Sequence, residues 1–303
     1  IQAIAEKYLE NSVKVNNVTE RGVVIVMNVN TGAILAMATK PDFDPNFPQA
    51  IGDPAVAQAL LELKESGAED YTEQLLQAQF DQWRNKAISD PYEPGSVFKI
   101  ITAAGALESG SATLNDTFYC PGYYIVAGRR KACWKAAGHG HVDFTQAVKF
   151  SCNPSFMMIG QKMGPRVFYD NFEAFGLMEP THIDLPGEAE GIFYSYDLLA
   201  KPSGEELASS SFGQTFKVTP LQLITAVSAV LNDGKLMQPY VVKQVIDSDG
   251  NVISGAEPVI KRQVISEATS DTMCQILEKV VGDPDGSGKK AYIPGYRVGG
   301  KTG

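Results

Sequence analysis

The order of strand-like and helix-like segments along the chain constrains its fold more than any other feature. Two apolar, strand-like runs at 23–28 and 33–38 lie near the N-terminus, separated by the turn sequence Asn30-Thr31-Gly32, and this pattern predicts a β-hairpin. A third strand is predicted at 296–303, whereas the region of about 97–285 is mostly helical in period. We therefore expect an α+β fold, with an antiparallel sheet built from both chain ends and a large helical subdomain between them.

Turn residues and periodicity divide the rest of the chain. Both ends of the sequence lie inside predicted elements, so we expect a single domain over 1–303 that is truncated at both ends. The other predicted elements are a helix at 1–9, a loop at 40–54, helices over 55–86 with a break near Gly67, a small β-hairpin around 118–134 and a strand at 239–246.

Composition indicates an ordinary globular domain and argues against nucleic-acid binding. Hydrophobic residues make up 44% and charged residues 20% of the chain, which is a typical globular balance. The net charge is −9, and neutralising phosphates requires clustered Lys and Arg, so no nucleic-acid partner is expected. No apolar run approaches the roughly 18 residues that span a bilayer, and the four cysteines are too few for a disulfide scaffold.

Ser96 stands where a breaker cluster meets an apolar helix. The sequence Pro91-Tyr92-Glu93-Pro94-Gly95 precedes it, and helical apolar spacing follows it. If Ser96 begins this helix, Lys99 lies one turn later on the same face, where its amine reaches the hydroxyl. A serine hydroxyl needs such a base beside it, and a lysine is a base only when burial or positive charge lowers its pKa. A second S-x-x-K, Ser287-Gly288-Lys289-Lys290, falls in a Gly-rich stretch that we interpret as solvated loop.

Two further motifs supply what this serine and lysine need. They are Ser151-Cys152-Asn153 and Lys301-Thr302-Gly303. Lys301 offers a positive charge that would lower the pKa of Lys99, and Ser151 and Asn153 offer a hydroxyl and an amide to relay protons and hold a substrate amide. The backbone N–H of Ser96, at a helix start, is directed toward a developing oxyanion. Each motif alone is a weak signal, but the three in this order indicate serine acyl-transfer chemistry.

With these motifs, the sequence resembles the class B, monofunctional penicillin-binding proteins over nearly its whole length. The stretches that carry the resemblance are Asn28–Pro41, Glu93–Lys99, Gly138–Gly140, Ser151–Asn153, Ser211–Gln214, Thr219–Gln222, Asn232–Pro239 and Gly299–Gly303. Within this group, three stretches are similar to the sporulation and cell-elongation transpeptidases of Gram-positive bacteria: Cys120-Pro121-Gly122, Cys133-Trp134 and Gly138-His139-Gly140.

The resemblance implies a fold like that of the serine β-lactamases and penicillin-binding proteins, and the activity of a D,D-transpeptidase. Such an enzyme cross-links peptidoglycan stem peptides through a serine acyl-enzyme, and β-lactams acylate and inhibit it. Ser96 would be acylated by the D-Ala-D-Ala end of a stem peptide, with Lys99 as the general base. Ser151 would relay protons, and Asn153 would bind the substrate amide.

The resemblance also implies a substrate-binding strand and a cellular setting. Lys301 and Thr302 would bind the terminal carboxylate that β-lactams mimic, and Gly303 would let the substrate backbone lie against the strand. In the family a second oxyanion donor follows this motif, so we expect the C-terminal strands and helix to be missing here and a protein ending at Gly303 to acylate poorly. No cofactor is implied for catalysis. The family further implies a glycosyltransferase partner and a place at the extracytoplasmic face of the bacterial cytoplasmic membrane, anchored by an N-terminal helix outside this chain.

Four residues form a candidate zinc site near the second motif. They are Cys120, Cys133, His139 and His141. Two thiolates and two imidazoles suit tetrahedral zinc, and the two histidines point the same way if their segment is extended. Cys152 is a rival fourth ligand, and any zinc would be structural. Two other interpretations stay open: a Cys120–Cys133 disulfide, or small buried cysteines with a structural His139.

Two other functions remain open on the sequence. A serine β-lactamase shares all three motifs, but the E-x-x-L-N sequence of the class A enzymes is absent between Asn153 and Lys301. A β-lactam sensor domain also keeps the serine and lysine, and it is acylated without cross-linking stem peptides. Persistence of a fluorescent penicillin label tests the first alternative, and cross-linking in cells tests the second.

Overall fold

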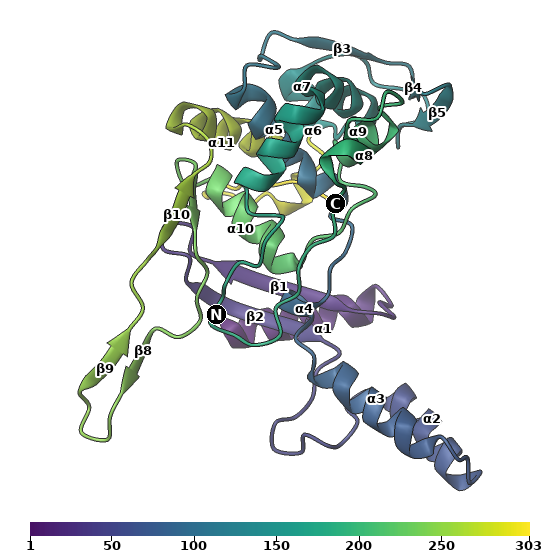
Figure 1. Ribbon diagram of the computed structural model, residues 1–303, viewed down its shortest axis with the longest axis vertical. Coiled ribbons are helices and arrows are strands. Elements are labelled where there is room, and N and C mark those ends of the chain that lie inside the picture. The colour runs from purple at the N-terminus through teal and green to yellow at the C-terminus, as the bar shows by residue number, and fades with distance from the viewer.

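The computed structural model describes residues 1–303 and has a helical body, a sheet layer and two projecting hairpins (Figure 1). A helical body lies at one end, and a two-stranded sheet covered by helices lies beneath it. Two hairpins project from the molecule: a helical one formed by α2 (Pro54–Glu65) and α3 (Tyr71–Trp83), and an arm formed by β8 (Gln244–Ile246) and β9 (Val252–Gly255). No helix is both long and apolar enough to cross a bilayer.

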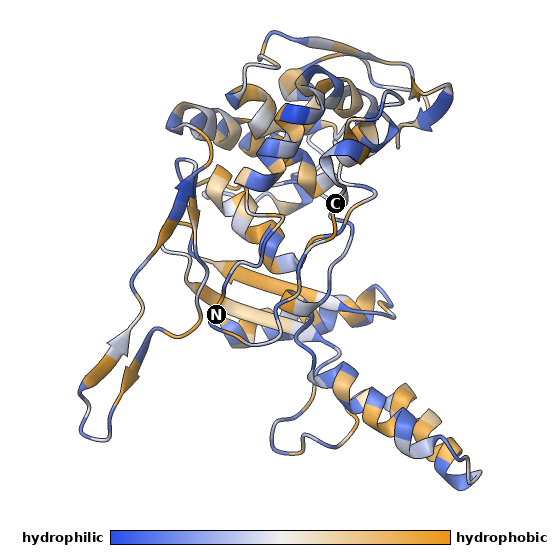
Figure 2. Ribbon diagram, viewed as in Figure 1, coloured by the Kyte–Doolittle hydropathy of each residue, from blue (hydrophilic) through white to orange (hydrophobic).

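The predicted N-terminal hairpin is confirmed as the antiparallel pair β1 (Gly22–Met27) and β2 (Ile34–Lys40). Aliphatic and β-branched residues favour strands, and Figure 2 shows both strands as largely hydrophobic. The turn between them requires Gly32, because its φ is +81° and a Cβ would overlap the Gln238 carbonyl oxygen.

Alternate residues of this sheet face different helices, as the pleat of a strand demands. Val24 and Val26 lie against α1 (Gln2–Val15), whose Ala5 and Leu9 are buried on the sheet. The opposite face packs against α4 (Lys86–Ser89) and α10 (Pro220–Val230). Since α4 leads directly toward Ser96, the sheet fixes the start of the segment that carries this residue.

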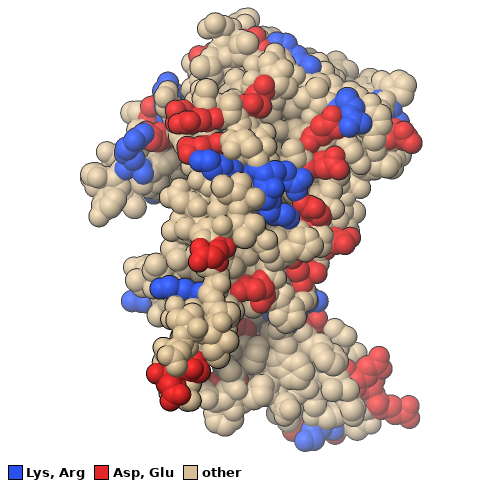
Figure 3. All heavy atoms as spheres, turned by 60° about the vertical axis from the view of Figure 1, so that its left-hand side comes forward, with Lys and Arg blue, Asp and Glu red and all other residues tan.

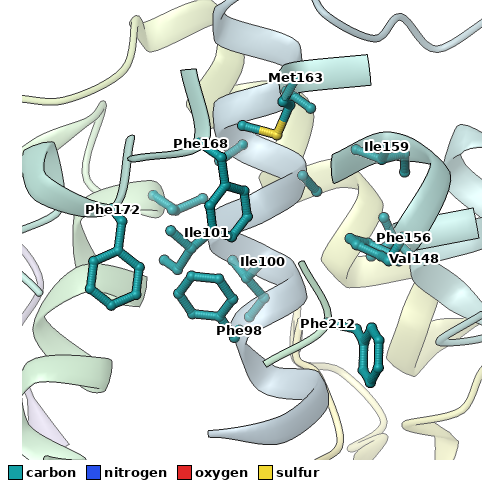
Figure 4. Close-up of a cluster of buried hydrophobic side chains, with 14 of the residues drawn as sticks. Phe98, Ile100, Ile101, Val148, Phe156, Ile159, Met163, Phe168, Phe172 and Phe212 are labelled. Atoms are coloured by element: carbon teal, nitrogen blue, oxygen red, sulfur yellow. The ribbon is translucent and has the colours of Figure 1, made fainter. Parts of the chain in front are cut away.

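The helical body surrounds α5 (Lys99–Glu108), which is buried on all sides from Lys99 to Ala106. Before it, η1 (Gly95–Phe98) places Phe98 against Phe168, Phe172 and Phe216, with ring centroids 4.7–6.2 Å apart. Figure 4 shows Phe98 and Ile101 packed beside Phe168 and Phe172. The neighbouring helices of the body are α6 (Phe144–Lys149), α7 (Asn153–Ala174, broken at Gly164), α8 (Tyr196–Leu199), α9 (Glu205–Ser210) and α11 (Glu267–Gly282).

Short strands edge the body. β3 (Thr117–Cys120) pairs directly with β6 (Gly140–Asp143) in an antiparallel sheet. The chain segment that connects them forms the hairpin of β4 (Tyr123–Val126) and β5 (Arg129–Ala132). A further pair joins β7 (Lys235–Met237) to β10 (Ile260–Gln263), and η2 (Lys289–Ala291) follows α11.

On the face that Figure 3 shows, Lys and Arg form small groups bordered by Asp and Glu rather than one basic surface.

Three predictions about elements need comment. The helical break near Gly67 is confirmed, since this residue follows α2 with φ +70°. The strand predicted at 239–246 is reduced to three residues of β8. The strand predicted at 296–303 is wrong: these residues form no strand, and Gly300 N–H donates instead to the Leu277 carbonyl of α11. Glycine-rich backbone has little strand preference, and no strand of the chain lies paired beside this segment.

Candidate active site

Ser96 lies in η1, and a second segment of the chain fixes the turn that delivers it. Tyr92 and Val218 exchange two backbone hydrogen bonds of 3.0 Å, and Gly95 N–H donates to the Gly213 carbonyl at 2.9 Å. The Glu93 carboxylate accepts from Thr215 N–H at 3.1 Å. Sequence reasoning included Gly213 only in a family motif and gave it no role. The structure makes it a close backbone neighbour of the turn that carries Ser96, because its φ of +90° and lack of a side chain permit the contact.

Lys99 is fully buried one helical turn after Ser96, as predicted. Its Nζ lies 3.1 Å from Ser96 Oγ, 3.0 Å from Ser151 Oγ and 2.7 Å from Asn153 Oδ1, and it contacts the Ser151 carbonyl at 2.9 Å. No carboxylate pairs with it. Burial, with a smaller contribution from the Lys301 charge, lowers the pKa of Lys99 to about 7. Near pH 7, Lys99 is therefore uncharged in a large fraction of the molecules, and in these its amine is able to accept the Ser96 proton.

Ser151 and Asn153 lie at the junction of α6 and α7. The end of α6 delivers Ser151 with φ +53°, a conformation that a residue with a side chain rarely adopts and that the surroundings must hold. Asn153 begins α7 and turns its Oδ1 to Lys99. Trp134 supports the junction, since its indole N–H donates to the Phe150 carbonyl at 3.0 Å.

Lys301 joins the same group from the C-terminal segment. Its Nζ lies 2.9 Å from Ser151 Oγ, and burial lowers the pKa of Lys301 to about 8. Thr302 and Gly303 are exposed beside it; the Thr302 carbonyl accepts from Lys301 Nζ at 2.9 Å. The structure thus brings together Ser96, Lys99, Ser151, Asn153 and Lys301. They supply a serine hydroxyl, an amine of lowered pKa, a hydroxyl that both lysines contact, a side-chain amide and a second lysine. This set of groups can form and discharge a serine ester.

The structure brings together three of the four residues of the predicted zinc site and leaves the fourth, His141, apart. The ligand atoms of Cys120, Cys133, His139 and Cys152 all lie within 4.8 Å of one another, and the three thiols are free and buried. Hydrogen bonding from the Cys152 thiol, aided by N–H groups of the chain, lowers the pKa of Cys133. The Cys133 sulfur lies 3.5 Å from His139 Nδ1, while His139 Nε2 is buried without a partner.

His141 lies outside this cluster. Gly140 has φ +70° and breaks the extended segment that would have aligned the two histidines. In β6, His141 pairs with Tyr119, and the centroids of their tilted rings are 4.9 Å apart, whereas Gly140 pairs with Cys120. Successive strand residues face opposite sides of the sheet, so His141 points away from the thiols and Cys152 takes its place in the cluster.

The chain matches known proteins over its whole length. Residues 22–303 match the penicillin binding protein transpeptidase domain. Stage V sporulation protein D of Bacillus subtilis is 38% identical over 305 residues, covering 100% of this chain and 42% of that protein. The penicillin-binding protein PbpB of Mycobacterium tuberculosis is 32% identical over 286 residues, covering 92% and 37%. The chain therefore spans less than half the length of these curated relatives.

Solved structures confirm the predicted fold class. The D,D-transpeptidase domain of a peptidoglycan glycosyltransferase from Eggerthella lenta superposes with a TM-score of 0.81 at 28% identity, over 99% of this chain and 69% of that one. Penicillin-binding protein 3 from Mycobacterium tuberculosis, complexed with aztreonam, gives 0.78 at 28% identity, over 97% and 60%. The chain belongs to the penicillin-binding protein transpeptidase family.

Proposed function

We propose that this chain is the catalytic domain of a peptidoglycan D,D-transpeptidase, in which Ser96 is the nucleophile and Lys99 its base. One observation carries the proposal: a fully buried lysine amine lies 3.1 Å from a serine hydroxyl and has no carboxylate partner. A lysine in such a place is poised to be neutral and to act as a general base.

The geometry supports a two-step acyl transfer. Lys99 Nζ takes the Ser96 proton while Ser96 Oγ attacks the carbonyl carbon of the penultimate D-Ala, and the Ser96 N–H stabilises the developing oxyanion. The tetrahedral intermediate collapses to a serine ester, and the terminal D-Ala leaves as an amine that receives a proton through Ser151 Oγ. The amine of a second stem peptide then attacks the ester carbonyl carbon and gives its proton to Lys99 Nζ. As the new amide bond forms, the bond from this carbon to Ser96 Oγ breaks, and Lys99 returns the proton to Ser96 Oγ. The Lys301 ammonium offers the charge that would hold the substrate carboxylate.

Acylation by a β-lactam tests this assignment directly. We expect the mass of the full-length protein to rise by one whole molecule of benzylpenicillin, and the rise to be lost in Ser96→Ala. Ser109→Ala, which removes an exposed hydroxyl after the other end of α5, should acylate normally. A mass rise in Ser96→Ala would assign the nucleophile elsewhere. A label that disappears rapidly would favour the β-lactamase alternative.

The wider setting rests on relatives. Because those relatives include peptidoglycan D,D-transpeptidases such as FtsI of Escherichia coli, we propose a stem peptide as substrate and the outer face of the cytoplasmic membrane as the place of action. We also propose a glycosyltransferase as working partner. Loss of cross-linking in cells that carry Ser96→Ala supports a transpeptidase, whereas retained cross-linking with lost β-lactam signalling supports the sensor alternative.

We also propose that Cys120, Cys133, His139 and Cys152 hold a structural zinc ion. Three thiols and one imidazole are a donor set that zinc prefers, and their separation below 4.8 Å suits one tetrahedral ion. Cys152 belongs to the second motif, so the ion would hold the β3–β6 region against the Ser151 junction. No step of the proposed reaction uses the metal.

Elemental analysis and thiol titration together distinguish the three interpretations of these cysteines, which are a zinc site, a disulfide and free buried thiols. We expect about one zinc per chain, lost in Cys133→Ser and retained in the matched variant Cys274→Ser, which changes a cysteine outside the cluster. Less than about a tenth of a zinc per chain would contradict the proposal. Thiol titration of the denatured protein then distinguishes a disulfide, which hides two thiols, from free cysteines.

A further inference from the structure

Lys149 lies two residues before Ser151 and has no part in the proposed reaction. Its side chain is 11% exposed at the end of α6, and its Nζ lies 2.9 Å from both the Asp283 and the Asp285 carboxylates. Burial acts to lower the pKa of Lys149, but the two carboxylates outweigh it, so the pKa is raised and the side chain stays charged. The stem of Lys149 is buried, and its ammonium group reaches two partly exposed carboxylates, both from the loop after α11.

Ser287 completes the contact between that loop and α6. Its Oγ donates to the Lys149 carbonyl at 2.7 Å, and its backbone N–H points to the same oxygen at 3.4 Å. The interpretation of this S-x-x-K stretch as solvated loop is therefore incomplete, because Gly286 and Gly288 are buried against Val280. Gly288 N–H donates to the Val280 carbonyl at 3.0 Å, so the loop is built onto the end of α11.

The same end of α11 supports the third motif. Gly300 N–H donates to the Leu277 carbonyl at 3.2 Å, and Arg297 pairs with Glu278 at 2.6 Å. One helical turn thus holds the segment that carries Lys301, and the loop directly after the helix holds the residue that leads into Ser151. Helix α11 also packs against α6. The distance between Lys301 and Ser151 therefore depends on α11 and its loop.

We propose that residues 283–287 form a clamp that positions Ser151 against Lys301 and Lys99 for acyl transfer. Asp283, Asp285 and Ser287 are positioning residues, since none of them reaches the reacting atoms. The clamp fixes the carbonyl and side chain of Lys149, and this constrains the path into the left-handed conformation of Ser151. Small displacements at such a junction slow a reaction strongly, because proton relay requires hydrogen-bond contact.

The test measures acylation of the full-length protein by a fluorescent penicillin, and it rests on the proposed function. Stopped-flow kinetics separate the rate constant at saturation from the dissociation constant, and active-site titration corrects for unfolded molecules. We expect Ser287→Ala to lower the saturating rate constant by about 3- to 10-fold with little change in the dissociation constant. Ser287→Thr, which keeps the hydroxyl, should restore it to within about twofold.

Two further variants make the result decisive. Thr272→Ala removes a hydroxyl-to-carbonyl hydrogen bond on the exposed side of α11, away from the clamp, and it should acylate at the rate of the unchanged protein. Asp283→Asn/Asp285→Asn should slow acylation in the same direction as Ser287→Ala. The clamp is refuted if both clamp variants keep the normal rate constant per active molecule, or if Thr272→Ala slows equally. Failure of the unchanged protein to acylate would instead refute the proposed function.

Discussion

Replacing Lys301 by methionine tests whether its charge tunes the base. In the unchanged protein we expect acylation to rise with pH through about 7, because the pKa of Lys99 is about 7 and only the neutral amine accepts a proton. Lys301 acts in its charged form, so activity should fall again as pH passes about 8, the pKa of Lys301. Lys301→Met should move the rising limb to higher pH, since a neighbouring positive charge no longer opposes protonation of Lys99.

The size of the shift follows from the geometry. Both lysine nitrogens contact Ser151 Oγ, at 3.0 and 2.9 Å, so they are at most about 6 Å apart. Unit charges at that distance repel by about 3 kcal/mol at an effective dielectric constant near 20, and about half remains after screening, because Lys301 is partly exposed. A difference of about 1.4 kcal/mol changes the protonation ratio tenfold, so the midpoint of the rising limb should increase by about one pH unit.

The assay is the saturating acylation rate constant between about pH 5.5 and pH 9.5, because saturation removes the effect of weaker substrate binding. Lys301→Arg is the matched control, since it keeps a positive charge and should leave the midpoint near that of the unchanged protein. If the methionine and arginine variants share one midpoint, the charge of Lys301 does not tune Lys99. If the unchanged protein shows no rise near pH 7, Lys99 is not the base.

Three further changes probe the surroundings of the site. Phe156→Leu removes a ring centred 5.3 Å from the Lys99 nitrogen. Because the ring favours the ammonium form, the pH midpoint of the acylation rate should move down by about half a pH unit or less. An upward move of this midpoint would contradict the reasoning. Gly213→Ala should lower the melting temperature and slow acylation, since the φ of Gly213 is +90° and a Cβ would overlap the Gly95 carbonyl. An unchanged melting curve would disprove the close approach of Gly213 to Gly95. Phe98→Ala should reduce the free energy of unfolding, measured in urea, by about 3–5 kcal/mol, because the ring is fully buried. A reduction below about 1 kcal/mol would indicate that the core collapses into the cavity left by the ring.

Local rules were enough to predict that Lys99 would contact Ser96. A breaker cluster before Ser96 and helical spacing after it determine that Lys99 lies one turn away, and both signals involve only neighbouring residues. The other motifs are different. Ser151 and Lys301 are 52 and 150 positions from the residues they contact, and only the family order of the motifs predicted that they would meet.

The failed predictions have two causes, a local turn of the backbone and a contact with a distant segment. Spacing placed His141 beside His139, but the positive φ of Gly140 turns the chain and gives that place to Cys152. Glycine-rich composition made Ser287 read as solvated loop, although its hydroxyl contacts a carbonyl 138 positions away. Periodicity reports how a segment faces its surroundings and does not report which segment it will meet.

Burial alone does not make a lysine catalytic, and Lys86 provides the comparison. Its side chain is also buried, and burial lowers the pKa of Lys86 as it does that of Lys99. Lys86 Nζ, however, contacts only backbone carbonyls, at 2.9–3.4 Å, and the nearby Asp90 carboxylate favours its charged form. Lys99 has the opposite surroundings: two hydroxyls within 3.1 Å and a second cation across Ser151. What distinguishes the proposed base from a structural lysine here is the serine hydroxyl within reach and the absence of a compensating carboxylate.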